Sequence, residues 1–190
     1  MVESAARGSR WTRRAQLHES EKPLTTVMSR QGLRSEPGAV VRPARRSDAA
    51  AVHRLSVPFV REGALRDRPA SRYARDAADF LVAETAHGGL AGCVALRRRP
   101  DARGRAAAVL YNFCVTAGSQ GRGIGSALLR AVLAEAAAQG VSRVFTATAG
   151  SGLLFLRHGF VVGGEEEAPP EWRARLDPAR GSRVLVCALA

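Results

Sequence analysis

The sequence predicts one mixed α/β (α+β) domain preceded by a disordered extension. The chain has 190 residues, of which 46% are hydrophobic, so it can bury one sizeable core. Short apolar runs bounded by turn residues alternate with segments of helical periodicity, in the order β-α-α-β-β-β-α-β-α-β-β. Residues 1–38 are instead polar and lack periodicity, so we expect them to be disordered and the domain to span residues 39–190. Met28 offers an alternative translation start.

The first half of the domain is expected to hold a strand, two helices and a hairpin. Ser47 can cap a helix whose apolar residues recur at helical spacing, and Pro58 should break or bend that helix. The glycine pair Gly88–Gly89 predicts a turn between two strands. The expected elements are a strand at 40–42, a helix from 47, a short helix at 73–78 and strands at 80–84 and 90–96.

The second half is expected to centre on a buried strand and a long helix. The strand at 106–115 is continuously hydrophobic, which is typical of burial on both faces. The alanine- and leucine-rich segment 126–139 favours a helix that stops at Gly140. The remaining elements are strands at 141–147, 160–162 and 183–188 and a short helix at 153–158.

Charge and cysteine content narrow the function classes. The net charge is +12, but the arginines are scattered and no recognition motif appears, so we expect no nucleic-acid partner. No apolar run could cross a bilayer and no secretory signal is present, which predicts a cytoplasmic protein without a membrane partner. The spacing of Cys93, Cys114 and Cys187 suits neither metal nor redox chemistry, so we expect reduced cysteines and no metal site.

The most informative segment runs from Val115 to Ser126, where a buried strand enters a glycine-rich loop that opens a helix. Glycines at 121, 123 and 125 allow the backbone to approach a ligand closely. Successive amides in such a loop can cradle an anion, aided by the helix dipole and by Arg122. The predicted ligand is a pyrophosphate, and the alternative is a turn that only joins strand to helix. A dinucleotide loop requires Gly-x-Gly-x-x-Gly and a later acidic residue, and a nucleoside-triphosphate loop requires Gly-Lys-Ser/Thr, so this segment matches neither.

Two motifs in the second half resemble those of the GNAT acyltransferase superfamily. Residues 120–125 (Gln-Gly-Arg-Gly-Ile-Gly) match its coenzyme A loop, Gln/Arg-x-x-Gly-x-Gly/Ala, and residues 155–160 resemble its aromatic-x-x-x-Gly-Phe signature. The resemblance implies a mixed, mostly antiparallel central sheet flanked by helices and splayed at the acetyl-CoA site. It also implies an N-acetyltransferase with acetyl-CoA as co-substrate. The implied coenzyme-binding residues are Val115, Thr116, Gln120, Gly121, Arg122, Gly123, Ile124, Gly125, Ser126 and Phe155.

Within the superfamily, the chain resembles the acetyltransferase domain of N-acetylglutamate synthase from about Val40 to Leu189. The segments that carry the resemblance are 63–68, 80–84, 91–96, 169–171 and 180–185. It implies a stand-alone short form, with arginine biosynthesis as its setting and a homodimer as one option. It further implies a small-molecule amine as acceptor, favouring the α-amino group of glutamate or a related amino acid. Arginine grips a carboxylate with two hydrogen bonds, and the implied substrate-binding residues are Arg68, Arg180 and Ser182.

The expected general base is missing. The family usually places a glutamate where Val109 stands and often a cysteine where Asn112 stands, and valine cannot accept a proton. Substitute catalytic candidates are Tyr111, which shares a strand face with Val109, together with Glu84, Glu62 and, as an acid, Cys114.

A backbone amide near Cys114 or Val115 would stabilise the oxyanion, whereas Phe155 cannot protonate a leaving thiolate. Two alternatives therefore stay open. One is a GNAT that acetylates a protein N-terminus or another amine, and the other is a coenzyme A-binding regulatory domain that has lost catalysis.

Overall fold

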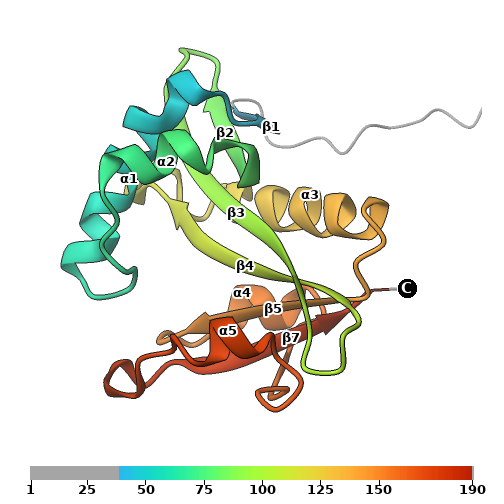
Figure 1. Cartoon of the computed structure of the whole chain (residues 1–190). Coiled ribbons are helices and arrows are strands. Elements are labelled where there is room, and N and C mark those ends of the chain that lie inside the picture. Colours follow the sequence, from blue (N-terminus) through green and yellow to red (C-terminus); the bar gives the residue numbers. More distant parts are fainter. Residues whose placement is uncertain (1–38, 190) are drawn as a thin grey trace, which may run out of the picture. The chain divides into compact units, whose positions relative to one another are not determined.

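The computed structural model describes residues 39–189, and the extension expected to be disordered lies outside them. The described residues form a seven-stranded sheet in the order β1-β2-β3-β4-β5-β7-β6 (Figure 1). Every neighbouring pair is antiparallel except β4 and β5. The predicted mixed α/β fold is therefore confirmed. The elements are β1 Ala39–Pro43, α1 Ala49–Arg61, α2 Ala70–Arg75, β2 Phe80–Thr85, β3 Leu90–Pro100, β4 Ala106–Val115, α3 Ile124–Ala138, β5 Arg143–Thr148, α4 Leu153–Arg157, β6 Val161–Val162, α5 Pro170–Arg173 and β7 Arg183–Ala188.

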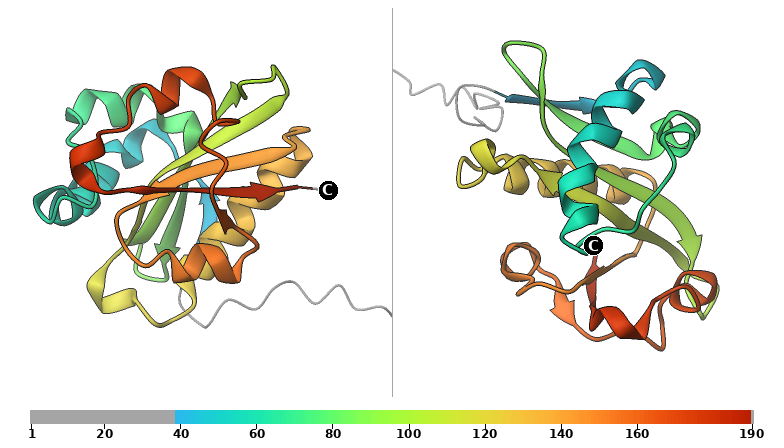
Figure 2. Two further views of the ribbon diagram at one scale, coloured as in Figure 1. Left: turned by 90° about the horizontal axis from the view of Figure 1, so that it is seen from below. Right: turned by 90° about the vertical axis from the view of Figure 1, so that its left-hand side faces the viewer.

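Helices cover both faces of the sheet, as two further views show (Figure 2). Alternation along β3 sends Val94 and Leu96 into the core under α3, whereas Cys93 and Ala95 face the core under α1. In the first core, Leu128 and Val132 of α3 are fully buried. Strand β4 contributes to both cores, which explains its continuous hydrophobicity.

The parallel strands β4 and β5 stay together over a short distance only. Their register covers three residue pairs, from Ala107 opposite Arg143 to Val109 opposite Phe145. Beyond Val109 the two strands separate, while β5 continues to pair with β7 as far as Thr148 (Figure 1). The sheet therefore opens toward the carboxyl end of β4, as the family resemblance implies.

Several local expectations differ from the structure. Pro58 lies inside α1, and the helix continues to Arg61, so the expected break is wrong. Burial of Val52 and Leu55 against the sheet offsets the one backbone hydrogen bond that proline cannot make. Ser47 does not cap α1. At this end of the helix, the Asp48 carboxylate accepts a hydrogen bond from the Arg45 amide at 2.7 Å.

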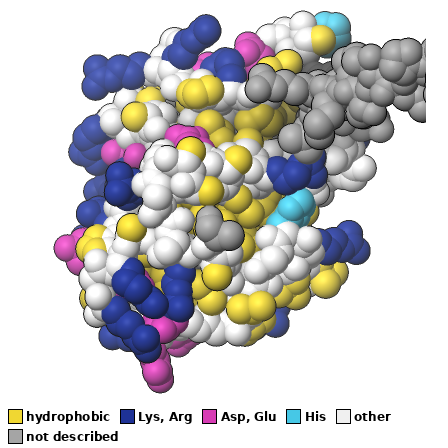
Figure 3. Space-filling view, turned by 90° about the vertical axis from the view of Figure 1, so that its right-hand side faces the viewer, with side chains coloured by type: hydrophobic (Ala, Val, Ile, Leu, Met, Phe, Trp, Pro, Cys, Tyr) yellow, Lys and Arg dark blue, Asp and Glu magenta, His cyan; other side chains and the backbone are white. Residues whose placement is uncertain are grey.

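Surface charge is dispersed on the face that Figure 3 shows. Basic side chains lie mostly near its edge with acidic side chains among them, and its middle shows hydrophobic side chains mixed with uncharged polar side chains and backbone (Figure 3). Over residues 39–189, no helix is long and apolar enough to cross a membrane.

Gly92 lies where α3 packs tightly against the sheet. A Cβ there would lie 2.8 Å from the Cys114 carbonyl oxygen and 2.9 Å from Leu128 Cδ1. We expect Gly92→Val to lower the free energy of unfolding by about 1–3 kcal/mol, because neither the strand backbone nor the buried helix can easily move. Urea unfolding measures the loss. Gly89→Ala is the control, since its Cβ would meet only Thr85 Oγ1 at 3.5 Å. Equal stability of the Val variant and the parent chain would contradict this close packing.

Candidate active site

The opening between β4 and β5 forms a cleft of about 330 Å³. Strand β4 and the end of β5 form its two walls, and the loop before α2 and the segment after α5 complete it. The lining residues that matter below are Arg66, Arg68, Tyr111, Asn112, Phe113, Phe155, Trp172, Leu176, Asp177, Arg180 and Ser182.

The glycine-rich loop leads from β4 to the start of α3. Gly121 and Gly123 have φ of 74° and 78°, a region that glycine adopts without strain. Gln120 fixes the loop, because its side-chain amide donates to the Val115 carbonyl at 3.2 Å. At the start of α3, the first backbone amide that has a backbone acceptor belongs to Ala127. It donates to the Gly123 carbonyl at 2.9 Å.

The amides of Gly125 and Ser126 precede that first bond. Neither has an acceptor at ordinary hydrogen-bond geometry among residues 39–189. The positive end of the α3 dipole lies at the same place. Open amides and a positive dipole end are the groups that an anion site requires, and binding of an anion here stays a prediction.

The loop and the cleft adjoin one another through Phe113. A Cβ on Gly125 would lie 3.1 Å from Leu154 Cδ2 and 3.5 Å from Phe113 Cζ, so the start of α3 packs against α4 and β4. Phe155 of α4 is buried and stacks edge-on against Phe113 and Phe160, with ring centroids 5.5 and 5.4 Å away. The aromatic signature residue therefore both packs the core and lines the cleft.

A β-bulge interrupts β4 beside the cleft. The β3–β4 register shifts between Cys93, opposite Cys114, and Ala95, opposite Tyr111, so β4 has one extra residue there. Asn112 within the bulge has a φ of 51°, a conformation that asparagine tolerates better than most residues. Its buried side chain donates to Ser56 Oγ at 2.9 Å and accepts from the Tyr73 hydroxyl at 3.4 Å.

Beyond the bulge, the ladder determines which amides face the cleft. The Thr116 amide donates to the Ala91 carbonyl at 2.9 Å. Because amides alternate in an antiparallel pair, the Cys114 amide points toward β3 and the Val115 amide points toward the open side. Of the two amides considered from the sequence, Val115 is therefore the one directed into the opening.

Asn112 should matter for stability through both its backbone and its side chain. We expect Asn112→Ala to lower the free energy of unfolding by about 2–4 kcal/mol, since alanine is strained at this φ and removes the buried amide that donates to Ser56 Oγ. Asn112→Gly removes the side chain only and should cost less. Chemical unfolding of both variants separates the two contributions, and an alanine variant as stable as the parent chain would refute them.

The three residues implied to hold a substrate all line the cleft, although they come from two distant parts of the chain. The Arg68 guanidinium lies over the Tyr111 ring, 4.6 Å from its centroid. Arg180 donates to the Gly63 carbonyl at 2.5 Å, and Ser182 follows two residues later. A further hydrogen bond from Arg66 to the Arg175 carbonyl joins the same two segments, residues 63–68 and 175–182. These two segments are therefore held together where they line the cleft.

The structure separates the proposed catalytic residues. Tyr111 lines the cleft, but its hydroxyl donates to Asp79 Oδ2 at 2.6 Å and accepts from Arg97 at 3.3 Å. Burial, together with the bond to Asp79, holds the pKa of Tyr111 well above its ordinary value. The phenol therefore stays protonated, which disfavours it as a base. Val109 is buried and lies on the same face of β4 as Tyr111, as expected from β-strand alternation.

The other three candidates are placed away from the cleft. Glu84 lies on β2 and pairs with Arg42 at 2.5 Å, which lowers the pKa of its carboxyl. Glu62 follows the end of α1 and lines no part of the cleft. The Cys114 thiol is buried in the core under α1, 4.0 Å from Ser56 Oγ, so packing is its role here.

Sequence reasoning missed three cleft residues near α5. Trp172 and Leu176 form an apolar part of the wall, and Asp177 contributes a carboxylate that accepts the Ala179 amide at 3.0 Å. The Asp177–Pro178 pair is a turn signal that could have drawn attention to this segment. Over residues 39–189, no cluster of three or more His, Cys, Asp or Glu side chains could hold a metal ion.

Comparison with known proteins agrees with this geometry. A family model described as an acetyltransferase (GNAT) domain matches residues 76–162. An amino-acid acetyltransferase of Ralstonia nicotianae is 33% identical over 147 residues, which cover 77% of this chain and 32% of that protein.

Solved structures with the same fold include coenzyme A complexes. N-acetylglutamate synthase of Neisseria gonorrhoeae, in complex with coenzyme A and N-acetyl-glutamate, superposes with a TM-score of 0.73 at 27% identity, covering 80% of this chain and 35% of the synthase. A Mycobacterium tuberculosis protein in complex with CoA gives a TM-score of 0.67 at 24% identity, covering 80% of this chain and 99% of that one.

The chain spans about a third of the length of the Ralstonia and Neisseria relatives, 32% and 35% respectively. The matched region includes β4, the glycine-rich loop, α3, β5 and α4, which supply the glycine-rich loop and both strand walls of the cleft. The chain therefore carries an acetyltransferase domain of the GNAT superfamily, as its sequence predicts.

Proposed function

We propose that this chain is an acetyl-CoA-dependent N-acetyltransferase whose acceptor is the α-amino group of an acidic amino acid, with glutamate favoured. One observation carries the proposal. At the end of β4, the backbone amides of Gly125 and Ser126, which have no acceptor within the described part of the chain, lie next to a cleft that is lined by arginines. The names of the Ralstonia and Neisseria relatives support an amino-acid acceptor. We further propose a cytoplasmic location and, with glutamate as the acceptor, a place in arginine biosynthesis.

The loop residues fit the diphosphate of coenzyme A. Added Cβ atoms on Gly121 and Gly123 would meet no protein atom within 4 Å, so a ligand can approach the backbone there. The amides of Gly125 and Ser126 supply donors and Arg122 supplies positive charge on an exposed loop. Bound acetyl-CoA supplies the acetyl group as a thioester, which would extend along the opening toward Phe113 and Phe155.

Two arginines and a serine suit an acidic amino acid. Arg180 keeps several N–H donors besides the one that bonds to Gly63, and Arg68 approaches the cleft from the opposite segment. Each guanidinium can hold one carboxylate with two parallel bonds. The hydrogen bonds of Arg66 and Arg180 join two segments that line the cleft, and we expect this link to favour a small-molecule acceptor over an extended peptide.

In the reaction, the amine nitrogen forms a bond to the thioester carbonyl carbon and the carbon–sulfur bond breaks. We assign the Val115 amide to the carbonyl oxygen, where negative charge develops, because that amide faces the opening. The arginines orient the amine, and such positioning accounts for much of the acceleration in enzymes of this kind. Phe155 has no proton to give, so the departing thiolate takes its proton from water.

The proton of the attacking ammonium requires an acceptor. Asp177 is the one carboxylate among the described residues that line the cleft, and we propose it as the base, acting directly or through water. Val109 cannot take this role, and Tyr111 is held protonated.

A thiol-release assay tests the proposed function. The purified chain is incubated with acetyl-CoA and a panel of amines, and free coenzyme A is followed with a thiol reagent. All three cysteines of the protein are buried, which keeps the background low. Glutamate-dependent release supports the proposal. Release with peptide N-termini or unrelated amines instead would favour a different acceptor class, binding without release would favour a regulatory domain, and failure to bind acetyl-CoA would refute the acyltransferase assignment.

A further inference from the structure

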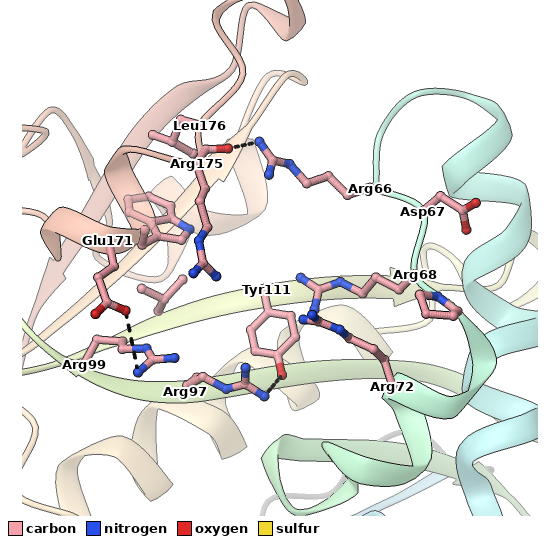
Figure 4. Close-up of a pocket in the computed structure, with 13 residues that line it drawn as sticks. Arg66, Asp67, Arg68, Arg72, Arg97, Arg99, Tyr111, Glu171, Arg175 and Leu176 are labelled. Atoms are coloured by element: carbon pink, nitrogen blue, oxygen red, sulfur yellow. Dashed lines mark hydrogen bonds and ion pairs between the residues drawn. The ribbon is translucent and has the colours of Figure 1, made fainter.

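A second cavity of about 360 Å³ adjoins the cleft on the far side of Tyr111. Arginine dominates its lining, and Figure 4 shows guanidinium groups from three separate segments directed toward the space around the Tyr111 ring. The titratable residues of this arginine cavity are Arg66, Arg68, Arg72, Arg97, Arg99, Arg175, Asp67, Glu171 and Tyr111.

Some of these arginines already have partners. Arg97 pairs with Asp76 at 3.0 Å and with Asp79 at 2.6 Å, and Arg66 donates to the Arg175 carbonyl. Arg99 lies 3.9 Å from Glu171, whose carboxylate is exposed, so this pair is weak. Asp67 points away from the cavity (Figure 4).

Three guanidinium groups are left over. Arg68, Arg72 and Arg175 have no carboxylate within 4.0 Å among residues 39–189. They converge from the loop before α2, from α2 itself and from the segment after α5 (Figure 4). Like charges held around one cavity repel each other, and a bound anion with more than one negative charge would relieve that repulsion.

The residues at the base of the cavity strengthen its preference for a multiply charged anion. Val109 and the Tyr111 ring form its base, and Trp172 and Leu176 form one side. These groups are uncharged, because the Tyr111 phenol keeps its proton toward Asp79. Electrostatic attraction is stronger beside such apolar walls than in bulk water. None of the loop residues 117–126 lines the cavity, so it is separate from the coenzyme cradle.

We propose that the arginine cavity is a subsite for a doubly charged oxyanion group, a phosphate ester or a pair of carboxylates, carried on the acceptor amine. Arg66, Arg68, Tyr111, Trp172 and Leu176 line both cavities, so an acceptor with its amine at the cleft can extend its anionic arm past them. This inference rests on the proposed function for the acceptor but not for the anion site itself, which can be tested alone.

Anion binding is tested first, without acetyl-CoA or acceptor. Trp172 lines the cavity, so its fluorescence should change as inorganic phosphate or malonate is added at constant ionic strength. The double variant Arg72→Ala/Arg175→Ala should weaken binding by roughly tenfold for each arginine removed. The control is Arg54→Ala/Arg98→Ala, which removes two exposed arginines that line neither cavity and should leave affinity unchanged.

Two outcomes of this titration would overturn the anion site. One is an equal loss of affinity in both double variants, which would indicate nonspecific attraction by net charge. The other is loss of the fluorescence change when coenzyme A is saturating, which would place the cavity within the coenzyme site. Trp172→Phe should abolish the signal, which would assign it to Trp172 and not to Trp11, the other tryptophan of the sequence. A stronger response to phosphate than to malonate identifies a phosphate ester as the arm, and the reverse order identifies two carboxylates.

The acceptor is tested second, by comparing O-phosphoserine, glutamate and alanine in the thiol-release assay. We expect the Arg72→Ala/Arg175→Ala variant to raise KM for the most highly charged acceptor by about tenfold or more while leaving kcat nearly unchanged, because uniform binding is lost. A KM increase of the same size for alanine would contradict an anionic arm. If phosphate binds but no amine is acetylated, the subsite stands and the proposed function fails, so the two failures are distinguishable.

Discussion

Gly123→Val should abolish measurable acetyl-CoA binding while the domain still folds. Gly123 has a φ of 78° and precedes the first residue of α3, so it sets the direction of the open amides of Gly125 and Ser126. Valine is strained at this φ by about 1–2 kcal/mol, and its side chain would also fill space that the glycine leaves to a ligand. We expect affinity to fall by about 100-fold or more, the equivalent of losing two or three charge-assisted hydrogen bonds. Calorimetric titration with coenzyme A measures this change.

Gly140 provides a matched control at the opposite end of the same helix. It has a φ of 70°, and an added Cβ would meet no protein atom within 4 Å, as at Gly123. Gly140→Val should therefore cause a similar loss of stability with no loss of coenzyme affinity. If both variants bind coenzyme A equally well, the assignment of the loop is wrong.

Arg180→Ala should lower kcat/KM for glutamate by about 100-fold. The substitution removes a guanidinium that would bind a carboxylate through two charge-assisted hydrogen bonds. The loss should appear mainly in KM, and acetyl-CoA affinity should be unchanged because none of the loop residues 120–126 lines the cleft with Arg180. Arg180→Lys keeps the charge without the planar fork and should recover only part of the loss.

Arg180→Ala also removes the hydrogen bond to the Gly63 carbonyl, which joins two segments that line the cleft, so a loss of activity could also arise from a loss of stability. Thermal unfolding of each variant shows whether the hydrogen bond between Arg180 and Gly63 contributes to stability. Equal kcat/KM for glutamate in the parent chain and in a folded Arg180→Ala variant would refute the carboxylate role.

Much of the fold could be predicted from the sequence because its periodic signals are strong. The strands at 106–115 and 183–188 have the expected bounds, and the alanine-rich helix differs by two residues at its start. The exceptions arise where tertiary contacts outweigh local preference. Pro58 stays helical because the helix is held by its buried face, and β3 continues four residues past Leu96 because it pairs with β4 through Pro100.

The coenzyme loop could be located from sequence because glycine spacing carries its own physical reason. The opposite side of the cleft could not, since its residues converge only when the chain folds. Glu84 was a reasonable base by residue type, but its position on β2 beside Arg42 takes it away from the cleft. Asp177 and Trp172 come from a segment of four-residue helix and turns whose sequence has no clear period. Asn112 had no signal for a bulge, because its positive φ depends on pairing between β3 and β4.

Main-chain amides at the start of α3 should hold the diphosphate of acetyl-CoA. A ¹H–¹⁵N correlation spectrum of the labelled chain, recorded with and without coenzyme A, tests it residue by residue. We predict the largest shifts at Gly123, Gly125 and Ser126, with the amides around Arg72 and Arg175 little changed. Shifts concentrated in the arginine cavity, with the loop amides unmoved, would contradict the account.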